Sequence, residues 1–306
     1  MFVLCCCLAL GSAMACAERF DFAAFGDTPY FSFEEPILVG QIQDMNQKDL
    51  AFVIHIGDIK SGSDRCTDFI YESRLAWFNE SKHPFILIPG DNDWTDCRRS
   101  SNGGYDPLER LNFFRRTFYK DTLSLGQRHL TLETQSTRPE FAEYRENMRW
   151  RHGGVLFATV HVVGSSNNEG TSEFGIRNRA NIAWLKESFS AAKREQASAM
   201  VVALHADPLF EISARDRRRS GLSEVMDRFL GETKTFAKPV LLIHGDSHRF
   251  RFDQPLRARG VNPSLRNLTR LEVHGSPMVA WTQVQIDTRS PGIFSVAPRP
   301  TAKELN

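Results

Sequence analysis

Four aspartates of the chain directly follow a glycine, and each Gly-Asp pair closes an apolar run. They are Asp27, Asp58, Asp91 and Asp246. The composition predicts about one such pair by chance, so the repetition carries more weight than any single pair. An apolar run that ends in a glycine and an acid is typical of a buried strand that stops at the edge of a sheet. Carboxylates that converge from several strand ends repel one another unless a cation lies among them, so the pattern predicts a metal site.

Two histidines extend this set of candidate ligands. His205 follows the apolar run 199–204, and His248 lies two residues after Asp246. A single histidine of this kind is more often a buried hydrogen-bonding residue, so the strand end alone leaves both readings of His205 and His248 open. Carboxylate oxygens and imidazole nitrogens together suit Mn, Fe, Zn or Mg.

Alternating strands and helices must position these residues. The order strand, helix, strand predicts parallel pairing with right-handed crossovers, which is an α/β fold. In such sheets ligands bind beyond the carboxyl ends of the strands. The expected strands are 19–25, 50–56, 84–88, a hairpin of 143–151 with 155–163, 199–204, 240–243, 268–273 and 279–286. The expected helices are 34–47, 67–79, 107–118, 178–194 and 223–230, and the expected loops include 119–140 and 164–170.

Taken in this order, the strand-end residues resemble the calcineurin-like metallophosphoesterase superfamily. The superfamily pattern runs DxH, GDxx, GNH(D/E), a lone His after an apolar strand, and GHxH. The corresponding segments of this chain run from Asp27 to His248 and so cover most of residues 18–306. The resemblance implies a four-layer fold, in which a two-sheet β-sandwich is flanked by helices. It also implies a dinuclear metal site across the strand ends.

Carried over by position, the resemblance assigns the ligands of two divalent metal ions. It implies a bridging Asp58, a first metal held by Asp27 and His248, and a second held by Asp91 or Asn92, His205 and Asp246. Two such ions about 3.5–4 Å apart activate a water and neutralise phosphate oxygens. The implied function is metal-dependent hydrolysis of a phosphomonoester or phosphodiester in a small phosphorylated substrate.

Three positions depart from the superfamily pattern. Pro29 replaces the His of DxH, Asn92 replaces the His of GNH(D/E), and Asp246 replaces the first His of GHxH. Losing the imidazole that assists the leaving group costs roughly a hundredfold in rate unless another group replaces it. Asn92 itself, Asp93 and His161 are the candidates for that catalytic role, although Asp93 fits a cap of the following turn equally well.

The departures keep a second function open. On the same fold, the altered ligand set would then form a catalytically impaired module that binds metal or a phosphorylated ligand. A metal-free adhesion or envelope protein is a third hypothesis, and it rests on little beyond export.

Composition limits the classes of function. The chain has 306 residues, 41% hydrophobic and 25% charged, with a formal net charge of +1. This near-neutral balance gives no global field for binding a nucleic-acid scaffold. No Pro/Ser-rich linker or low-complexity segment divides residues 18–306, so we expect them to form one domain.

Residues 1–17 are typical of a secretory signal peptide. Residues 2–15 are apolar and small, and Ala13-Met14-Ala15 or Ala15-Cys16-Ala17 offers a cleavage pattern. No Lys or Arg precedes the apolar stretch, so an uncleaved anchor is the alternative. We expect a secreted or periplasmic protein with no membrane span in the mature chain.

Cysteine usage agrees with export. Cys66 and Cys97 are the two cysteines beyond residue 17, and each follows a Gly-Asp pair by a few residues. In an exported protein, two cysteines in neighbouring loops predict a disulfide. A thiolate metal pair is the weaker alternative, because the sequence has no CxxC spacing beyond the signal.

Overall fold

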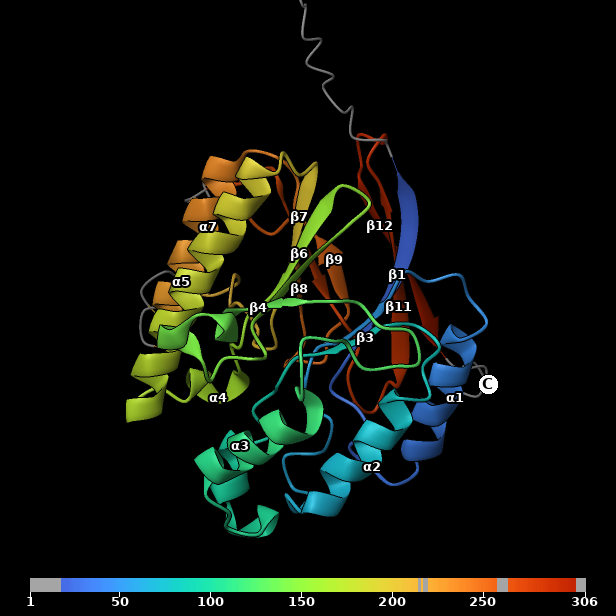
Figure 1. Cartoon of the computed structure of the whole chain (residues 1–306), viewed down its shortest axis with the longest axis vertical. Coiled ribbons are helices and arrows are strands. Elements are labelled where there is room, and N and C mark those ends of the chain that lie inside the picture. Colours follow the sequence, from blue (N-terminus) through green and yellow to red (C-terminus); the bar gives the residue numbers. More distant parts are fainter. Residues whose placement is uncertain (1–17, 214–215, 217–219, 258–263, 301–306) are drawn as a thin grey trace, which may run out of the picture.

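Figure 1 shows two β-sheets packed between helices. The computed structural model describes residues 18–213, 216, 220–257 and 264–300. The predicted signal peptide, residues 1–17, lies outside the described residues.

The first sheet has five strands. Their order is β12 (Phe294–Pro300), β11 (Ala280–Asp287), β1 (Arg19–Phe25), β2 (Val53–His55) and β3 (Phe85–Leu87). β1, β2 and β3 run parallel, whereas β11 runs antiparallel to β1. Residues 22–25 of β1 are completely buried. This is the pattern of a central strand that is covered on both faces.

The second sheet has seven strands. Their order is β4 (Glu133–Thr134), β5 (Met148–His152), β6 (Val155–Thr159), β7 (Ala199–Ala203), β8 (Val240–His244), β10 (Leu268–Glu272) and β9 (Arg251–Asp253). β6, β7, β8 and β10 are parallel. The carboxyl ends of these four strands therefore lie at one edge of the second sheet. In the same way, the carboxyl ends of β1, β2 and β3 lie at one edge of the first sheet.

Helices cover the outer face of each sheet (Figure 1). α1 (Glu35–Met45), α2 (Asp68–Phe78) and α3 (Pro107–Phe118) pack on the five-stranded sheet. α5 (Ser172–Arg194) and α7 (Ser223–Phe236) pack on the seven-stranded sheet. The short helical segments are α4 (Gly164–Asn167), η1 (Thr95–Arg98), η2 (Ser100–Asn102), η3 (Gln135–Thr137) and η4 (Pro139–Phe141).

The two larger hydrophobic cores of the described residues hold the layers together. Between the sheets, the ring of Phe157 lies 5.0 Å from that of Phe52 and 5.6 Å from that of Phe22. Successive residues of β7 alternate between the cores, since Val201 faces the other sheet and Val202 packs beneath α5 and α7. This two-residue period follows from strand geometry, and it fixes the strand ends rigidly.

The predicted two-sheet α/β architecture flanked by helices is confirmed. Three strands, β4, β9 and β12, were not predicted. β12 contains Pro298 and Pro300, which a sheet tolerates because this strand lies at its edge. α5 begins at Ser172, earlier than the expected residue 178, because Thr171 caps it by accepting the backbone N–H of Phe174. The expected loop 119–140 contains β4 and η3.

Within the described ranges, no helix is long and apolar enough to cross a membrane.

Candidate metal centre

Both sheets direct acids and imidazoles from their strand ends into one cluster. Asp27, Asp58 and Asp91 follow β1, β2 and β3 of the first sheet. His205 and Asp246 follow β7 and β8 of the second. The cluster therefore lies where the carboxyl ends of the two sheets meet, the usual ligand position in α/β folds.

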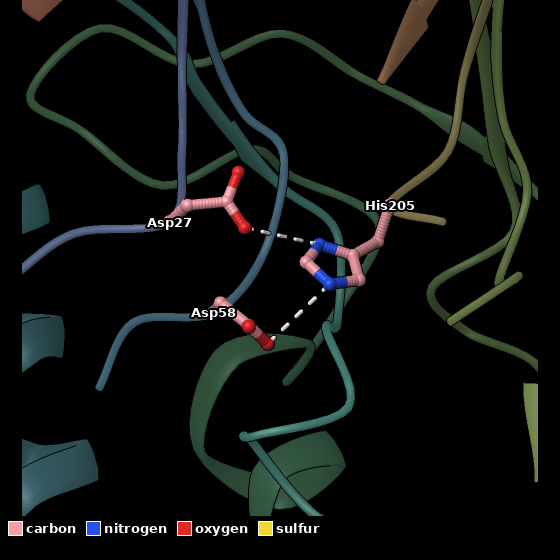
Figure 2. A group of neighbouring side chains, drawn as sticks. All are labelled: Asp27, Asp58 and His205. Atoms are coloured by element: carbon pink, nitrogen blue, oxygen red, sulfur yellow. Dashed lines mark ion pairs between the residues drawn. The ribbon is translucent and has the colours of Figure 1, made fainter. Parts of the chain in front are cut away.

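His205 lies at the centre of this cluster. Its Nε2 is 3.0 Å from Asp91 Oδ1, 3.5 Å from Asp58 Oδ1 and 3.9 Å from Asp246 Oδ1. Its Nδ1 is 4.0 Å from Asp27 Oδ1. Figure 2 shows the carboxylates of Asp27 and Asp58 directed at the two nitrogens of the ring.

Backbone carbonyls fix the orientation of both imidazoles. Nδ1 of His205 donates to the carbonyl of Ile56 at 2.9 Å, and Nδ1 of His248 donates to that of Ser276 at 2.7 Å. The Nε2 atom of each ring is then left facing carboxylates. For His248, Nε2 lies 3.7 Å from Asp27 Oδ1. Histidine ligands of metals are commonly held in this way through the second ring nitrogen.

Burial makes the negative charge of the cluster costly. Desolvation raises the pKa of Asp27 to about 7, and it also raises the pKa of Asp58 and of Asp246. Burial alone would raise the pKa of Asp91, but the hydrogen bond with His205 and the charge of that imidazole outweigh it and lower the pKa. The cluster is therefore short of positive charge without a cation.

His205 carries the charge that a cation would otherwise supply. Burial alone would lower its pKa, but the facing carboxylates of Asp58 and Asp91 outweigh this effect and raise the pKa well above its ordinary value. A cation bound at Nε2 would take the place of that proton. Metal affinity of such a site depends on the same exchange.

The cluster brings together donor atoms of the kind that a divalent cation binds. Donor atoms lie within 4.8 Å of one another in each of two groups, Asp27 with Asp58 and His205, and Asp91 with His205 and Asp246. Glycines keep room for these carboxylates: a Cβ on Gly90 would collide with Asp58, and one on Gly164 with Asp91 and Asp246. The clustered Asp and His side chains suggest divalent-metal binding.

The backbone is strained at the same positions. Asp27, Asp58, Asp246 and His248 have φ values of 52°, 55°, 74° and 60°, in the left-handed region. Such conformations cost about 1–3 kcal/mol each and gather at functional sites, where the surrounding structure holds them. Here they turn each side chain back toward the cluster directly after its strand.

One side of the cluster is open to solvent. The side chains of Asp246 and His248 are 29% and 27% exposed, whereas that of Asp27 is completely buried. A ligand of the cluster would therefore reach it from the side of Asp246 and His248.

Tyr30 belongs to the site, and the sequence analysis missed it. Its hydroxyl donates to Asp58 Oδ2 at 2.7 Å and accepts from Asn92 Nδ2 at 3.0 Å. The backbone N–H of Asn92 donates to Asp58 Oδ1 at 2.9 Å. Burial raises the pKa of Tyr30 well above its usual value, so the phenol stays protonated. The signal was its place three residues after Asp27, in the same loop.

Ser165 is a second residue that the sequence analysis missed. Its hydroxyl donates to Asp91 Oδ2 at 2.7 Å. It begins a run of four residues, 165–168, with φ between 50° and 56°. The buried Arg177 holds this left-handed turn by donating to the side chain and the backbone carbonyl of Asn167. The expected loop at 164–170 gave no indication of such a turn.

The structure places Asp93 beneath the cluster. Its carboxylate is completely buried and accepts the backbone N–H groups of Gly90, Asp58 and Ile59 at 2.7, 3.0 and 2.9 Å. These three bonds tie the loop after β2 to the loop after β3. They favour the structural reading of Asp93, as a cap of these loops, over the catalytic one.

The structure places His161 in a separate buried network. Its Nδ1 is 2.7 Å from Glu146 Oε1, and Glu146 also pairs with Arg115. Burial lowers the pKa of His161 to about 4. Its ring packs against Trp94. Its hydrogen bond goes to Glu146, which is not one of the strand-end residues of the Asp/His cluster. These contacts favour a structural role for His161 as well.

The predicted disulfide is present. Cys66 and Cys97 are bonded, with their Cα atoms 5.7 Å apart, and both are completely buried. The bond joins the loops that carry Asp58 and Asp91. A thiolate metal pair is excluded, because both sulfurs are used in the disulfide.

Comparisons with solved structures concern the fold. The chain is similar to GAP50, the anchor in the inner membrane complex of Plasmodium, with a TM-score of 0.53 at 12% identity over 92% of this chain and 89% of that chain. A phosphatase from Mycoplasma pneumoniae has a TM-score of 0.45 at 11% identity, over 94% and 97%. The 5'-nucleotidase from Candida albicans has a TM-score of 0.43 at 13% identity, over 91% of this chain and 50% of that chain.

No protein-family model and no curated protein matches the sequence. At identities this low, the structural likeness concerns the fold alone. The likeness that reaches a TM-score above 0.5, that to GAP50, therefore shows a shared two-sheet α/β fold and no activity.

Proposed function

We propose that the chain is an exported, metal-dependent phosphoesterase that hydrolyses phosphomonoesters or phosphodiesters at a dinuclear site. The observation that carries the proposal is the convergence of carboxylates from both sheets on His205. Four strand-end aspartates have an oxygen within 4.0 Å of one of its two ring nitrogens.

The geometry supports a division of the ligands between two cations. Asp27 and His248 lie together at one end of the cluster, and Asp91 and Asp246 lie near His205 Nε2 at the other. Asp58 has an oxygen 3.5 Å from His205 Nε2 and also groups with Asp27, so it would bridge the two cations. Bound there, Mn, Fe, Zn or Mg would act as a Lewis acid on the phosphoryl group and on the attacking water.

The side chains around Asp58 supply neutral hydrogen-bond donors. The Asn92 amide and the Tyr30 phenol lie in contact with each other beside this carboxylate. Neither adds negative charge, so both suit a site that must accept a phosphate. They would orient phosphoryl oxygens in place of the imidazole that the resemblance leads one to expect at Asn92.

Export is part of the proposal. The buried Cys66–Cys97 disulfide supports it, because disulfides persist in oxidising compartments and are rare in the cytosol. A small phosphorylated compound outside the cytoplasm is then the substrate class.

A catalytically impaired binding module is the second candidate. Pro29, Asn92 and Asp246 take the places of three superfamily histidines. GAP50, whose fold is similar, is described as an anchor. On this alternative the same cluster would hold metal or a phosphorylated ligand without turnover.

Hydrolysis of p-nitrophenyl phosphate and of bis(p-nitrophenyl) phosphate with added Mn²⁺ tests the proposal. We expect turnover in the wild type and a loss of about a hundredfold or more in Asp58→Asn, since the variant loses the bridging charge. The matched control is Asp49→Asn, which makes the same charge change at an exposed position before β2. Metal binding without turnover would favour the binding module, and the absence of both would overturn both proposals.

A further inference from the structure

An exposed aromatic pair lies on one of the loops of the candidate metal centre. Phe31 and Phe33 are 55% and 60% exposed. Their rings are stacked, with centroids 5.4 Å apart and an interplanar angle of 8°. Two parallel rings that remain this exposed present a flat apolar face to solvent, which is costly unless something covers it.

The loop that carries this pair is fixed to the cluster. Tyr30, the residue before Phe31, contacts Asp58 through its hydroxyl. The buried carboxylate of Glu34 accepts the backbone N–H of Tyr30 at 2.6 Å and the hydroxyl of Ser276 at 2.6 Å. The aromatic pair is therefore held between two anchored residues, Tyr30 and Glu34.

A second loop of the site adds an apolar side chain. Met278, which is 42% exposed, lies two residues after Ser276, whose carbonyl orients His248. The backbone N–H of Ser276 also donates to the carbonyl of Asp27. The loop that carries Asp27 and the loop that hydrogen-bonds His248 thus each expose large apolar side chains. Methionine is flexible and makes favourable contacts with aromatic rings.

We propose that Phe31 and Phe33 bind a planar aromatic group of the substrate by stacking, beside the phosphate bound at the cluster. This inference rests on the proposed function and names its substrate class: phosphoesters of an aromatic alcohol or of a nucleoside. The rings would bind the aromatic part and the cluster the phosphoryl group, so each contributes to affinity separately. Stacking on an aromatic side chain tolerates different rings, because every planar base or aryl group has a π face.

The test compares three substrates in the Phe31→Ala/Phe33→Ala variant. Phenyl phosphate and adenosine 5′-monophosphate carry a planar ring, and glycerol 3-phosphate does not. We expect KM to rise about tenfold for either or both ring-bearing substrates and to stay unchanged for glycerol 3-phosphate. A rise for one of the two alone identifies the aryl or the nucleoside class. The matched control is Phe69→Ala, because Phe69 is 75% exposed but lies on α2.

An equal change for all three substrates, or no change for any, would overturn the inference. If the wild type hydrolyses none of the three compounds, the proposed activity fails. Calorimetric binding of the same compounds with Mn²⁺ then tests whether Phe31 and Phe33 bind the aromatic ring. Tighter binding of adenosine monophosphate or phenyl phosphate than of glycerol 3-phosphate, lost in the double variant, would then support it. Equal binding of all three would reject it.

Discussion

Asn92 is the residue at which the site departs most from the pattern it resembles. Its side chain donates to Tyr30, and its backbone holds Asp58. An imidazole in its place would supply a proton donor for the leaving group. We expect Asn92→His to raise kcat for alkyl phosphates, whose leaving groups are poor, by about tenfold or more. Rates for p-nitrophenyl phosphate would change less, because that leaving group needs little assistance.

The control for this substitution is Asn92→Ala, which removes the contact with Tyr30 without adding an imidazole. We expect no gain in rate from it. If both variants change the alkyl and aryl rates alike, Asn92 does not limit the release of the leaving group.

The raised pKa of Asp27 predicts a pH-dependent response to metal. Its pKa is 3.8 when unperturbed and about 7 in the metal-free fold. Because Asp27 binds its proton more tightly in the fold than in the unfolded chain, its raised pKa stabilises the fold below about pH 4. This contribution to the free energy of unfolding is lost as the pH rises through 7. A bound cation requires the ionised carboxylate. Added Mn²⁺ should therefore raise Tm by on the order of 5 °C or more at pH 8, and by clearly less at pH 5.

Thermal unfolding with EDTA and with Mn²⁺ at both pH values measures this difference. An Asp27→Asn variant has no carboxylate to titrate and should show a smaller metal response at pH 8. If Mn²⁺ raised the Tm of the wild type equally at pH 5 and pH 8, this would contradict the raised pKa of Asp27.

Among the elements, the loops after β2 and β3 depend on a covalent link. The Cys66–Cys97 disulfide spans a sequence separation of 31 and restricts the unfolded chain. A loop of this length contributes about 3–4 kcal/mol. Reduction should lower Tm by on the order of 10 °C. It should also weaken metal binding, because these loops carry Asp58 and Asp91.

The Cys66→Ser/Cys97→Ser variant is the control for reduction. It should start at the lower Tm and show no further response to reductant. A wild type whose Tm is the same with and without reductant would show that the disulfide does not stabilise these loops.

The strand ends were predictable because the sequence itself marks them. Each Gly-Asp pair followed an apolar run, and parallel strands bring such ends to one edge of a sheet. That reasoning placed Asp27, Asp58, Asp91 and Asp246 without knowledge of the sheet order. Strand patterns alone did not show that the two sheets would bring their ends together, which only the family resemblance implied and which depends on the packing of Phe22, Phe52 and Phe157.

The remaining features depend on tertiary contacts. Tyr30 and Ser165 join the cluster through hydrogen bonds across the chain, to Asp58 and Asp91. Neither residue type is unusual in a loop, so residue type does not mark them, and the one signal for Tyr30 is its place three residues after Asp27. β12 reads as a poor strand because of its prolines, and only its edge position permits it. His161 could be read as a proton donor only without knowledge of its burial against Glu146.

For the molecule as a whole, the proposed export through a cleaved signal peptide predicts a processed N-terminus. Cleavage after Ala15 or Ala17 would leave a mature chain that begins at residue 16 or 18. Mass spectrometry of the protein from its native host, or from a secreting host, should find one of these ends and no free thiol at Cys66 or Cys97. A chain that retains Met1 would favour the uncleaved anchor over a cleaved signal peptide, and reduced Cys66 and Cys97 would contradict export.

The metal content of the purified protein tests the central claim most directly. Protein prepared without chelator and analysed for bound elements should carry about two divalent cations per chain. Asp58→Asn should carry fewer, while Asp49→Asn should match the wild type, because only Asp58 lies within the cluster. A wild type with no more bound cation than Asp58→Asn would contradict the claim that these strand-end acids and imidazoles form a metal site.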